Sequence, residues 1–158
     1  MSDKSPAEVR QDMWKAMAAS PYVMLKLENG HAHAEPMMAQ LDPDADSEFW
    51  FYCGRDNRAA AGGEAMVQFV GKGHEMFACI SGTLTEETRE DIKDKYWSKQ
   101  VEAWFPGGRQ DPNLMMLRFD LGSAEIWEAD VSLTGKFKML TGQTIDARES
   151  GDHATVNV

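Results

Sequence analysis

Short β-type segments follow one another through the middle of the chain, and their order restricts the fold more than any other feature. Apolar and aromatic runs of strand length, bounded by Gly, Pro, Asn and Asp, predict strands at 22–28, 31–41, 48–53, 65–70, 75–85, 114–121 and 124–129. Helices do not alternate with single strands, as a doubly wound parallel sheet requires. The order therefore predicts an α+β, mainly β fold: a small antiparallel barrel of about six strands with flanking helices.

Glycine-containing turns join several of these strands. Asn29-Gly30 lies between the first two, and because both residues accept positive φ it predicts a tight hairpin. Segment 56–65 predicts a short helix or a loop. Gly122-Ser123 separates the last two predicted strands.

The start of the chain predicts a surface helix over 5–18. Ser5 and Glu8 have the spacing of a capping box, and Pro6 occupies the first helical position. The apolar stripe of this helix consists of Val9, Met13 and Met17. Apolar residues at roughly helical spacing predict a second helical stretch over 87–105.

We expect one domain over 1–158. It comprises the helix 5–18, a barrel over 22–130 with the helical insertion 87–105, and a C-terminal segment over 131–158. Within that last segment only 155–158 predicts a weak strand.

Charge and composition exclude several classes of partner. The chain carries 26 acidic and 16 basic side chains, a formal net charge of −10, so its surface repels nucleic acid. Apolar runs fall short of the roughly 20 residues that a membrane span needs, and the charged N-terminus lacks the signal-peptide pattern. Cys53 and Cys79 lie within apolar runs and predict reduced thiols. We expect a cytoplasmic protein that contacts neither membrane nor nucleic acid.

His31, His33 and Glu35 form the first group that could carry chemistry. Within a strand, residues two apart share a face, so these side chains would line up and could bind a transition metal. Three ligands on one strand span too far to close easily around one ion, and a more distant third ligand, such as His74 or His153, would fit better. A polar strand face is the simpler interpretation, and we predict no metal site.

The second group is the run Arg55, Asp56, Asn57 and Arg58, directly after the aromatic strand 48–53. A guanidinium fork, an amide and free backbone N–H groups at such a junction could hold a phosphate. Taken alone, the run is better explained as a charged turn.

The third group is Trp104 and Phe105, which enter the Gly/Pro-rich loop 106–112. Together with Trp127 on the last strand they could form a flat apolar slot for a ring system. The alternative is that they anchor the core and an interface loop. The sequence contains no Gly-rich nucleotide fingerprint and no nucleophile elbow.

Three segments together resemble the general stress group of the pyridoxamine 5′-phosphate oxidase-like family. They are GHAHAEPM at 30–37, FWFYC at 49–53 followed by Asn57-Arg58, and AWFPGGRQDP at 103–112 with IWE at 126–128. The resemblance covers about residues 5–130 in strand order. It implies a split-barrel homodimer that binds FMN, sometimes FAD, in two equivalent clefts at the subunit interface.

The resemblance also implies which residues would border that cofactor. These are Glu35, Pro36, Met37, Tyr52, Cys53, Asn57, Arg58 and Trp127, with Asn57 and Arg58 at the phosphate. Glu35 occupies the position where the family usually has an arginine that meets the phosphate, and Cys53 replaces a threonine or serine. We therefore expect FMN, or FAD, with an affinity that Glu35 weakens.

These observations predict a flavin-binding general stress-type protein with oxidoreductase activity, without assigning a substrate or a catalytic residue. The alternative is a non-catalytic ligand-binding or stress dimer that keeps the fold and binds flavin weakly or not at all. Oxidation of pyridoxamine phosphate is not expected, because the chain is shorter than those oxidases and lacks their C-terminal arginine and histidine signature.

Overall fold

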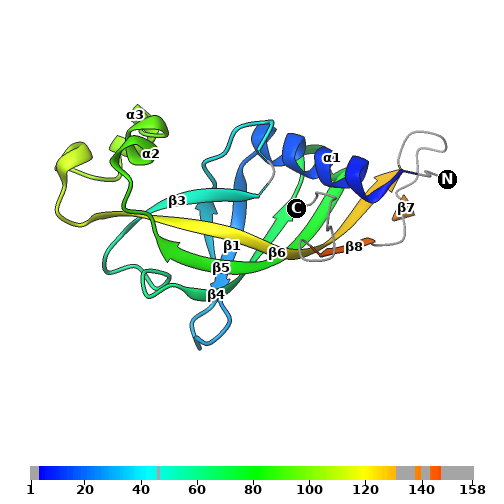
Figure 1. Cartoon of the computed structure of the whole chain (residues 1–158), viewed down its shortest axis with the longest axis horizontal. Coiled ribbons are helices and arrows are strands. Elements are labelled where there is room, and N and C mark those ends of the chain that lie inside the picture. Colours follow the sequence, from blue (N-terminus) through cyan, green and yellow to red (C-terminus); the bar gives the residue numbers. More distant parts are fainter. Residues whose placement is uncertain (1–3, 46, 131–137, 140–142, 147–158) are drawn as a thin grey trace.

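Six antiparallel strands form the body of the molecule (Figure 1). The computed structural model describes residues 4–45, 47–130, 138–139 and 143–146. The strands are β1 (Tyr22–Leu27), β2 (Glu35–Met38), β3 (Glu48–Gly54), β4 (Gly63–Val70), β5 (Met76–Glu86) and β6 (Leu114–Asp130), in the sheet order β2-β1-β4-β5-β6-β3. Two short strands, β7 (Lys138–Met139) and β8 (Gln143–Asp146), pair with β6 and were not expected from the sequence.

The two ends of this strand order meet, so the sheet closes into a nearly complete barrel. Just after β2, Gln40 pairs with Trp50 of β3. The Gln40 N–H donates to the Trp50 carbonyl at 2.7 Å, and the Trp50 N–H donates back at 3.0 Å. The predicted antiparallel barrel of six strands is confirmed.

Alternating burial along the strands explains why the sheet curls around one core. On β1, Val23 and Leu25 are buried while Tyr22 and Met24 are exposed, which is the two-residue period of a half-buried strand. The strand β3 is buried on both faces, because its outer face is covered by the helical segment described below. The largest fully buried side chains of the core are Phe49, Phe51, Phe69, Phe119, Met13, Met17, Leu25, Ile80, Leu84, Met116, Leu117 and Ile126.

Helix α1 (Pro6–Ala19) begins as the sequence predicts. The Ser5 side chain accepts from the Glu8 N–H at 3.2 Å and the Glu8 carboxylate accepts from the Ser5 N–H at 3.1 Å, which completes the capping box. Its buried face consists of Val9, Met13, Trp14 and Met17. Trp14 packs edge-on against Phe49 with ring centroids 5.9 Å apart, so this helix closes one side of the core.

The predicted helical stretch 87–105 is two short helices, α2 (Glu90–Lys95) and α3 (Lys99–Glu102), rather than one. The break lies at Ser98, whose side chain accepts from the Val101 N–H at 3.2 Å and starts a new helix. In Figure 1 these helices lie at the end of the molecule away from α1. They are followed by one 3₁₀ turn, η2 (Gly108–Gln110), and then by β6.

The first hairpin differs from its prediction. The strands β1 and β2 do pair antiparallel, with Leu25 opposite Glu35, but residues 28–34 form a longer connection. Gly30 and Asn29 keep negative φ, so the tight turn that needs positive φ at both is absent. His31 and His33 therefore lie exposed in this connection and do not share a strand face with Glu35.

The final strands were also predicted differently, since 114–121 and 124–129 are parts of the single strand β6. Opposite its middle, β5 has a register irregularity between Ser81 and Gly82. A side chain at Gly82 would overlap the Asp120 carbonyl oxygen and lie 2.7 Å from the Phe119 ring. This glycine lets β6 bend and continue where the sequence suggests a break.

Two further predictions concern the end of the chain and membrane-spanning helices. The predicted weak strand at 155–158 lies outside the described residues. Among the described helices, none combines the length and apolar character required to span a membrane.

Candidate functional site

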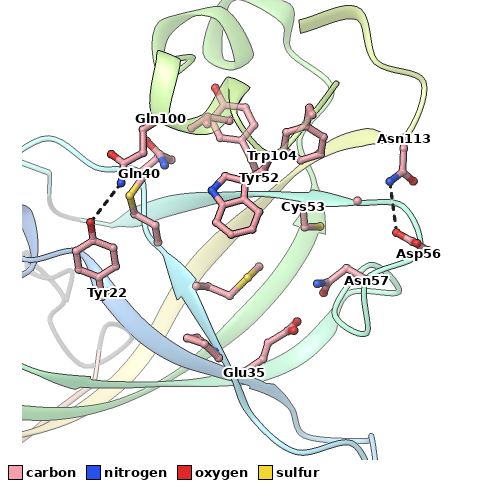
Figure 2. Close-up of a pocket in the computed structure, with 16 residues that line it drawn as sticks. Tyr22, Glu35, Gln40, Tyr52, Cys53, Asp56, Asn57, Gln100, Trp104 and Asn113 are labelled. Atoms are coloured by element: carbon pink, nitrogen blue, oxygen red, sulfur yellow. Dashed lines mark hydrogen bonds between the residues drawn. The ribbon is translucent and has the colours of Figure 1, made fainter. Parts of the chain in front are cut away.

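A cleft of about 560 Å³ opens between β2, β3, the turn after β3 and the segment that contains α3 (Figure 2). In Figure 2, Trp104 and Gln100 lie at one end of the cleft and Glu35 lies at the other. The lining residues are Tyr22, Glu35, Pro36, Met37, Met38, Gln40, Tyr52, Cys53, Gly54, Asp56, Asn57, Gln100, Val101, Trp104, Phe105 and Asn113.

The lining near α3 is aromatic and apolar. Trp104 leaves 80% of its surface exposed, which is unusual for the largest apolar side chain. Phe105 of the same lining is buried, and Met37 and Met38 line the cleft from β2. Flat rings and adaptable methionine side chains form a surface that suits a planar ligand.

Tyr52 is the best-fixed ring of this lining. Its hydroxyl donates to the Lys93 carbonyl of α2 at 2.5 Å, and its ring meets Trp97 edge-on with centroids 5.7 Å apart. Burial is the main reason that the pKa of Tyr52 rises above its ordinary value. The hydroxyl is thus a neutral donor committed to the backbone, and the ring face is what Tyr52 offers to a ligand.

Cys53 also lines the cleft, but its thiol is not set up as a nucleophile. The side chain is buried, and burial, with a smaller effect from the nearby Glu35 carboxylate, raises the pKa of Cys53 to about 12. A thiol with this pKa is almost wholly protonated near neutral pH.

The opposite end of the cleft is polar and acidic. Glu35 and Asp56 line it together with the amides of Asn57 and Asn113. The Asn57 side-chain oxygen accepts from the Ala59 N–H at 2.7 Å, as in an ordinary Asx turn. The two carboxylates are the charged groups of the described lining.

Arg58 lies beside this acidic end without lining the cleft. Its Nη1 donates to the His33 carbonyl at 2.9 Å, and its Nε lies 3.5 Å from Glu35 Oε2. The other Glu35 oxygen, Oε1, is buried without a hydrogen-bond partner in the described part of the chain. The pair therefore neutralises Arg58 and leaves the carboxylate incompletely satisfied.

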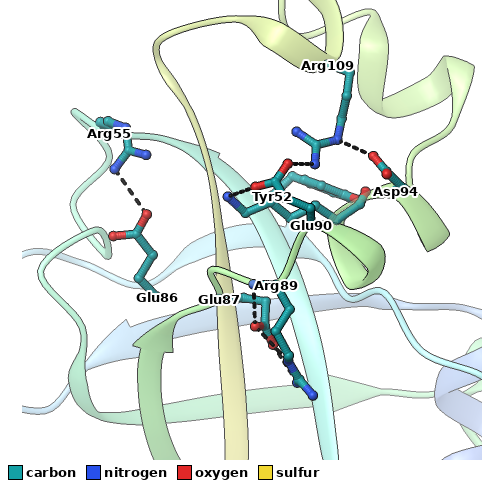
Figure 3. Close-up of polar contacts among 9 residues, drawn as sticks. Tyr52, Arg55, Glu86, Glu87, Arg89, Glu90, Asp94 and Arg109 are labelled. Atoms are coloured by element: carbon teal, nitrogen blue, oxygen red, sulfur yellow. Dashed lines mark hydrogen bonds and ion pairs between the residues drawn. The ribbon is translucent and has the colours of Figure 1, made fainter.

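A buried carboxylate fixes the segment that leads into α2 (Figure 3). Glu87 is 2% exposed and accepts from Trp50 Nε1 at 3.0 Å, from Arg89 Nη2 at 2.7 Å and from Arg89 Nε at 3.0 Å. These bonds lower the pKa of Glu87 to about 2 despite its burial, and the hydrogen bonding from the Arg89 side chain contributes most. Because Trp50 belongs to β3, this contact holds the start of the helical segment against the barrel.

The structure brings together most of the residues predicted for the site. Six of them line one cleft: Glu35, Pro36, Met37, Tyr52, Cys53 and Asn57. Arg58 lies next to it, turned toward Glu35. Trp127 does not line this cleft: it lies on β6 beyond Gly122, in register with Phe77 of β5.

Several lining residues were not singled out from the sequence. They are Tyr22, Met38, Gln40, Gly54, Gln100, Val101 and Asn113. Gln100 donates to the Tyr22 hydroxyl at 3.3 Å. The two residues are 78 positions apart, so no local sequence pattern predicts this contact. Trp104 and Phe105 were predicted as a ring slot from their place before the Gly/Pro-rich loop, and both line the cleft.

His31 and His33 lie in the exposed connection after β1, outside this lining. Over the described residues, no three His, Cys, Asp or Glu side chains are grouped so that they could hold a metal ion.

Comparison with known proteins agrees with this architecture. The general stress FMN/FAD binding protein from Xanthomonas citri is 39% identical, with a TM-score of 0.75 over 86% of this chain and 99% of that chain. A general stress family protein of Xanthomonas campestris pv. campestris is 38% identical, with a TM-score of 0.75 over 88% of this chain and 99% of that one. General Stress Protein 26 from Bacillus anthracis str. Sterne, at 15% identity, shares the fold with a TM-score of 0.61 over 84% of this chain and 97% of that chain.

No curated protein matches the sequence. The model of the family described as pyridoxamine 5′-phosphate oxidase like matches residues 8–148, which is most of the chain. The nearly closed antiparallel barrel is the split barrel seen in its structural relatives. The chain therefore belongs to the pyridoxamine 5′-phosphate oxidase-like family.

Proposed function

We propose that this chain binds a flavin, with the isoalloxazine ring in the cleft between β2, β3 and α3. The observation that carries the proposal is the aromatic lining built from Tyr52, Trp104 and Phe105. The 39% identity to a Xanthomonas citri protein described as FMN/FAD binding supports it. Stacking on aromatic side chains and burial of apolar area would supply the affinity.

The two ends of the cleft fit a flavin unequally. The aromatic end suits the ring, whereas the acidic end offers no cationic side chain of the described residues to a phosphate. Arg58, which we expected at the phosphate from the sequence, is paired with Glu35. The residues therefore fit the ring of FMN or FAD and do not fit the phosphate.

We also propose that the functional unit is a homodimer whose second subunit covers the mouth of the cleft. Trp104 and Tyr22 line this cleft and leave 80% and 58% of their surfaces exposed. Exposed aromatic surface at the rim of a site is the kind of area that a partner covers. An isologous contact would place two equivalent clefts in one dimer.

A bound flavin would supply oxidoreductase chemistry, while the protein would orient it and limit its contact with water. A second function, binding without turnover, is favoured by one observation. The described lining contains no histidine, and the Tyr52 phenol and the Cys53 thiol are both held in the protonated form. Proton transfer would then depend on the Glu35 or Asp56 carboxylate, on the bound substrate or on water.

A titration followed by flavin fluorescence tests the binding proposal. Stacking against Tyr52 and Trp104 should quench the flavin, with one flavin bound per chain. Trp104→Ala should weaken binding by about tenfold, the cost of about 1.4 kcal/mol for one lost stacking contact. Val70→Ala is the matched control, since Val70 is 49% exposed and lies outside the cleft.

Equal effects of the two variants would place the ring elsewhere on the protein. Absence of quenching up to a flavin concentration of about 1 mM, where even weak sites fill, would refute the proposal. Consumption of a reduced nicotinamide by the flavin-loaded protein would separate turnover from binding alone.

A further inference from the structure

The charged side chains that line the cleft, among the described residues, are all negative. Glu35 and Asp56 line it, and no lysine, arginine or histidine does so in the part of the chain that the structure describes. The formal charge of the whole chain, −10, adds to the same potential. A phosphate that enters this cleft meets repulsion from the wall and from the surface around it.

The arginines that flank the cleft are committed to carboxylates. The pairs are Arg58 with Glu35 at 3.5 Å, Arg55 with Glu86 at 3.2 Å, and Arg109 with Glu90 at 2.8 Å and with Asp94 at 2.9 Å. Figure 3 shows that Arg55 and Arg109 point at these acids. A phosphate would have to displace a carboxylate from an existing pair, so it would exchange one anion for another with little gain.

Glu35 also needs a donor. Its Oε1 is buried without a hydrogen-bond partner among the described residues, and its Oε2 meets Arg58 only at ion-pair distance. A carboxylate in this state is costly unless a donor approaches it. Hydroxyl and N–H groups of an uncharged ligand can supply that hydrogen bond, whereas an ionised phosphate carries acceptors only.

We propose that Glu35 makes the cleft selective for an unphosphorylated flavin-type ligand over its phosphate ester. The ring lies against the aromatic end, and a neutral polyol or N–H-bearing group donates to Glu35 at the acidic end. This selectivity rests on the proposed flavin binding and adds the charge of the preferred ligand to it. Riboflavin and FMN share the ring and the ribityl chain and differ by the phosphate, so they are the probes.

The test measures both dissociation constants by fluorescence quenching in wild type, Glu35→Gln and Glu64→Gln. Wild type should bind riboflavin at least about tenfold more tightly than FMN. Glu35→Gln should reduce this ratio to about twofold, chiefly because FMN binding tightens once the repulsion is removed. Glu64→Gln removes the same charge from an exposed position of β4 outside the cleft and should keep the wild-type ratio.

Salt gives an independent readout that requires no variant. Raising the ionic strength should tighten FMN binding to wild type and leave riboflavin binding almost unchanged, because screening acts on the phosphate alone. Circular dichroism of each variant shows whether it is folded before its constants are compared.

Other outcomes overturn the proposal in distinguishable ways. FMN that binds wild type as tightly as riboflavin refutes the selectivity and leaves flavin binding intact. Loss of that FMN affinity in Arg58→Ala would show that Arg58 leaves Glu35 to meet the phosphate. Equal ratios in Glu35→Gln and Glu64→Gln would remove Glu35 from the explanation. If neither flavin binds, the proposed function fails and the selectivity fails with it.

Discussion

Replacing Glu87 by glutamine should destabilise the fold in a pH-dependent way. The substitution keeps the size of the side chain and removes the charge that receives hydrogen bonds from Trp50 Nε1 and from three nitrogens of Arg89, the backbone N among them. One acceptor oxygen becomes an amide nitrogen that faces Arg89 donors. Glu87 is 2% exposed, so water cannot replace the lost interactions.

The magnitude follows from the pKa of Glu87, which falls from an ordinary 4.5 to about 2 in the fold. A shift of this size corresponds to at most about 3 kcal/mol of stability. The Arg89 side chain is 52% exposed, and solvent screens its share of the interaction. We therefore expect Glu87→Gln to lower the free energy of unfolding by about 1–2 kcal/mol near neutral pH.

The sign of the pH dependence is fixed by the lowered pKa. The charged Glu87 stabilises the fold above its unfolded-state pKa, and this contribution is lost as the pH falls from 4.5 toward about 2. Urea unfolding of wild type and Glu87→Gln should therefore show a gap at neutral pH that narrows steadily across that acidic window.

Glu90→Gln is the matched control, because the Glu90 side chain is 69% exposed and its pairs with Lys93 and Arg109 lie at the surface. This variant should unfold at nearly the wild-type urea concentration. A gap for Glu87→Gln that stays constant from neutral to acidic pH would refute the assignment of stability to the charged carboxylate. An effect no larger than that of Glu90→Gln would refute the importance of the buried contact.

Three further results are expected. Gly82→Ala should lower the free energy of unfolding by about 1–3 kcal/mol, because the added methyl group overlaps the neighbouring strand. Gly30→Ala is the control and should change the free energy of unfolding little, since no atom lies closer than 3.8 Å to the added Cβ. Equal urea midpoints for the two variants would contradict the close approach at Gly82. In a Cys79→Ser variant at about pH 8, iodoacetamide should alkylate Cys53 roughly a thousandfold more slowly than a free thiol, because burial raises the pKa of Cys53 to about 12. Labelling at the rate of a free thiol would contradict the burial of Cys53. Light scattering should give twice the chain mass at tens of micromolar protein, and a mass near 17.7 kDa would count against the shared cleft.

Local chemistry explains the parts of the fold that the sequence predicted. Ser5 and Glu8 complete a capping box within four residues, and β3 is a compact aromatic run, so each element is determined by its own neighbours. The prediction of one helix over 87–105 was wrong, because the spacing of apolar residues does not reveal that Ser98 caps a second helix. The tight turn at Asn29-Gly30 was wrong because a longer connection between β1 and β2 does not require positive φ.

Contacts between distant segments explain what the sequence did not predict. The continuity of β6 depends on Gly82 of β5, which lies about forty residues earlier and allows close approach at the bend. The contribution of Tyr22 and Gln100 to the cleft depends on where β1 and α3 come together in space. Periodicity describes which face of an element is apolar, and it cannot describe which element that face will meet.

In the proposed mode of binding, the cleft would recognise a ring and a phosphate through separate features. Ring binding depends on apolar area and shape, which the backbone paths of β2 and β3 and the position of Trp104 determine. Phosphate binding depends on a cation that is free to pair, and Arg58 is held by Glu35 and by the His33 carbonyl. An acid at position 35 therefore acts twice, because it adds a negative charge to the wall and neutralises the nearest arginine. Under the proposed selectivity, one side chain would change the charge of the preferred ligand while the shape of the cleft stays the same.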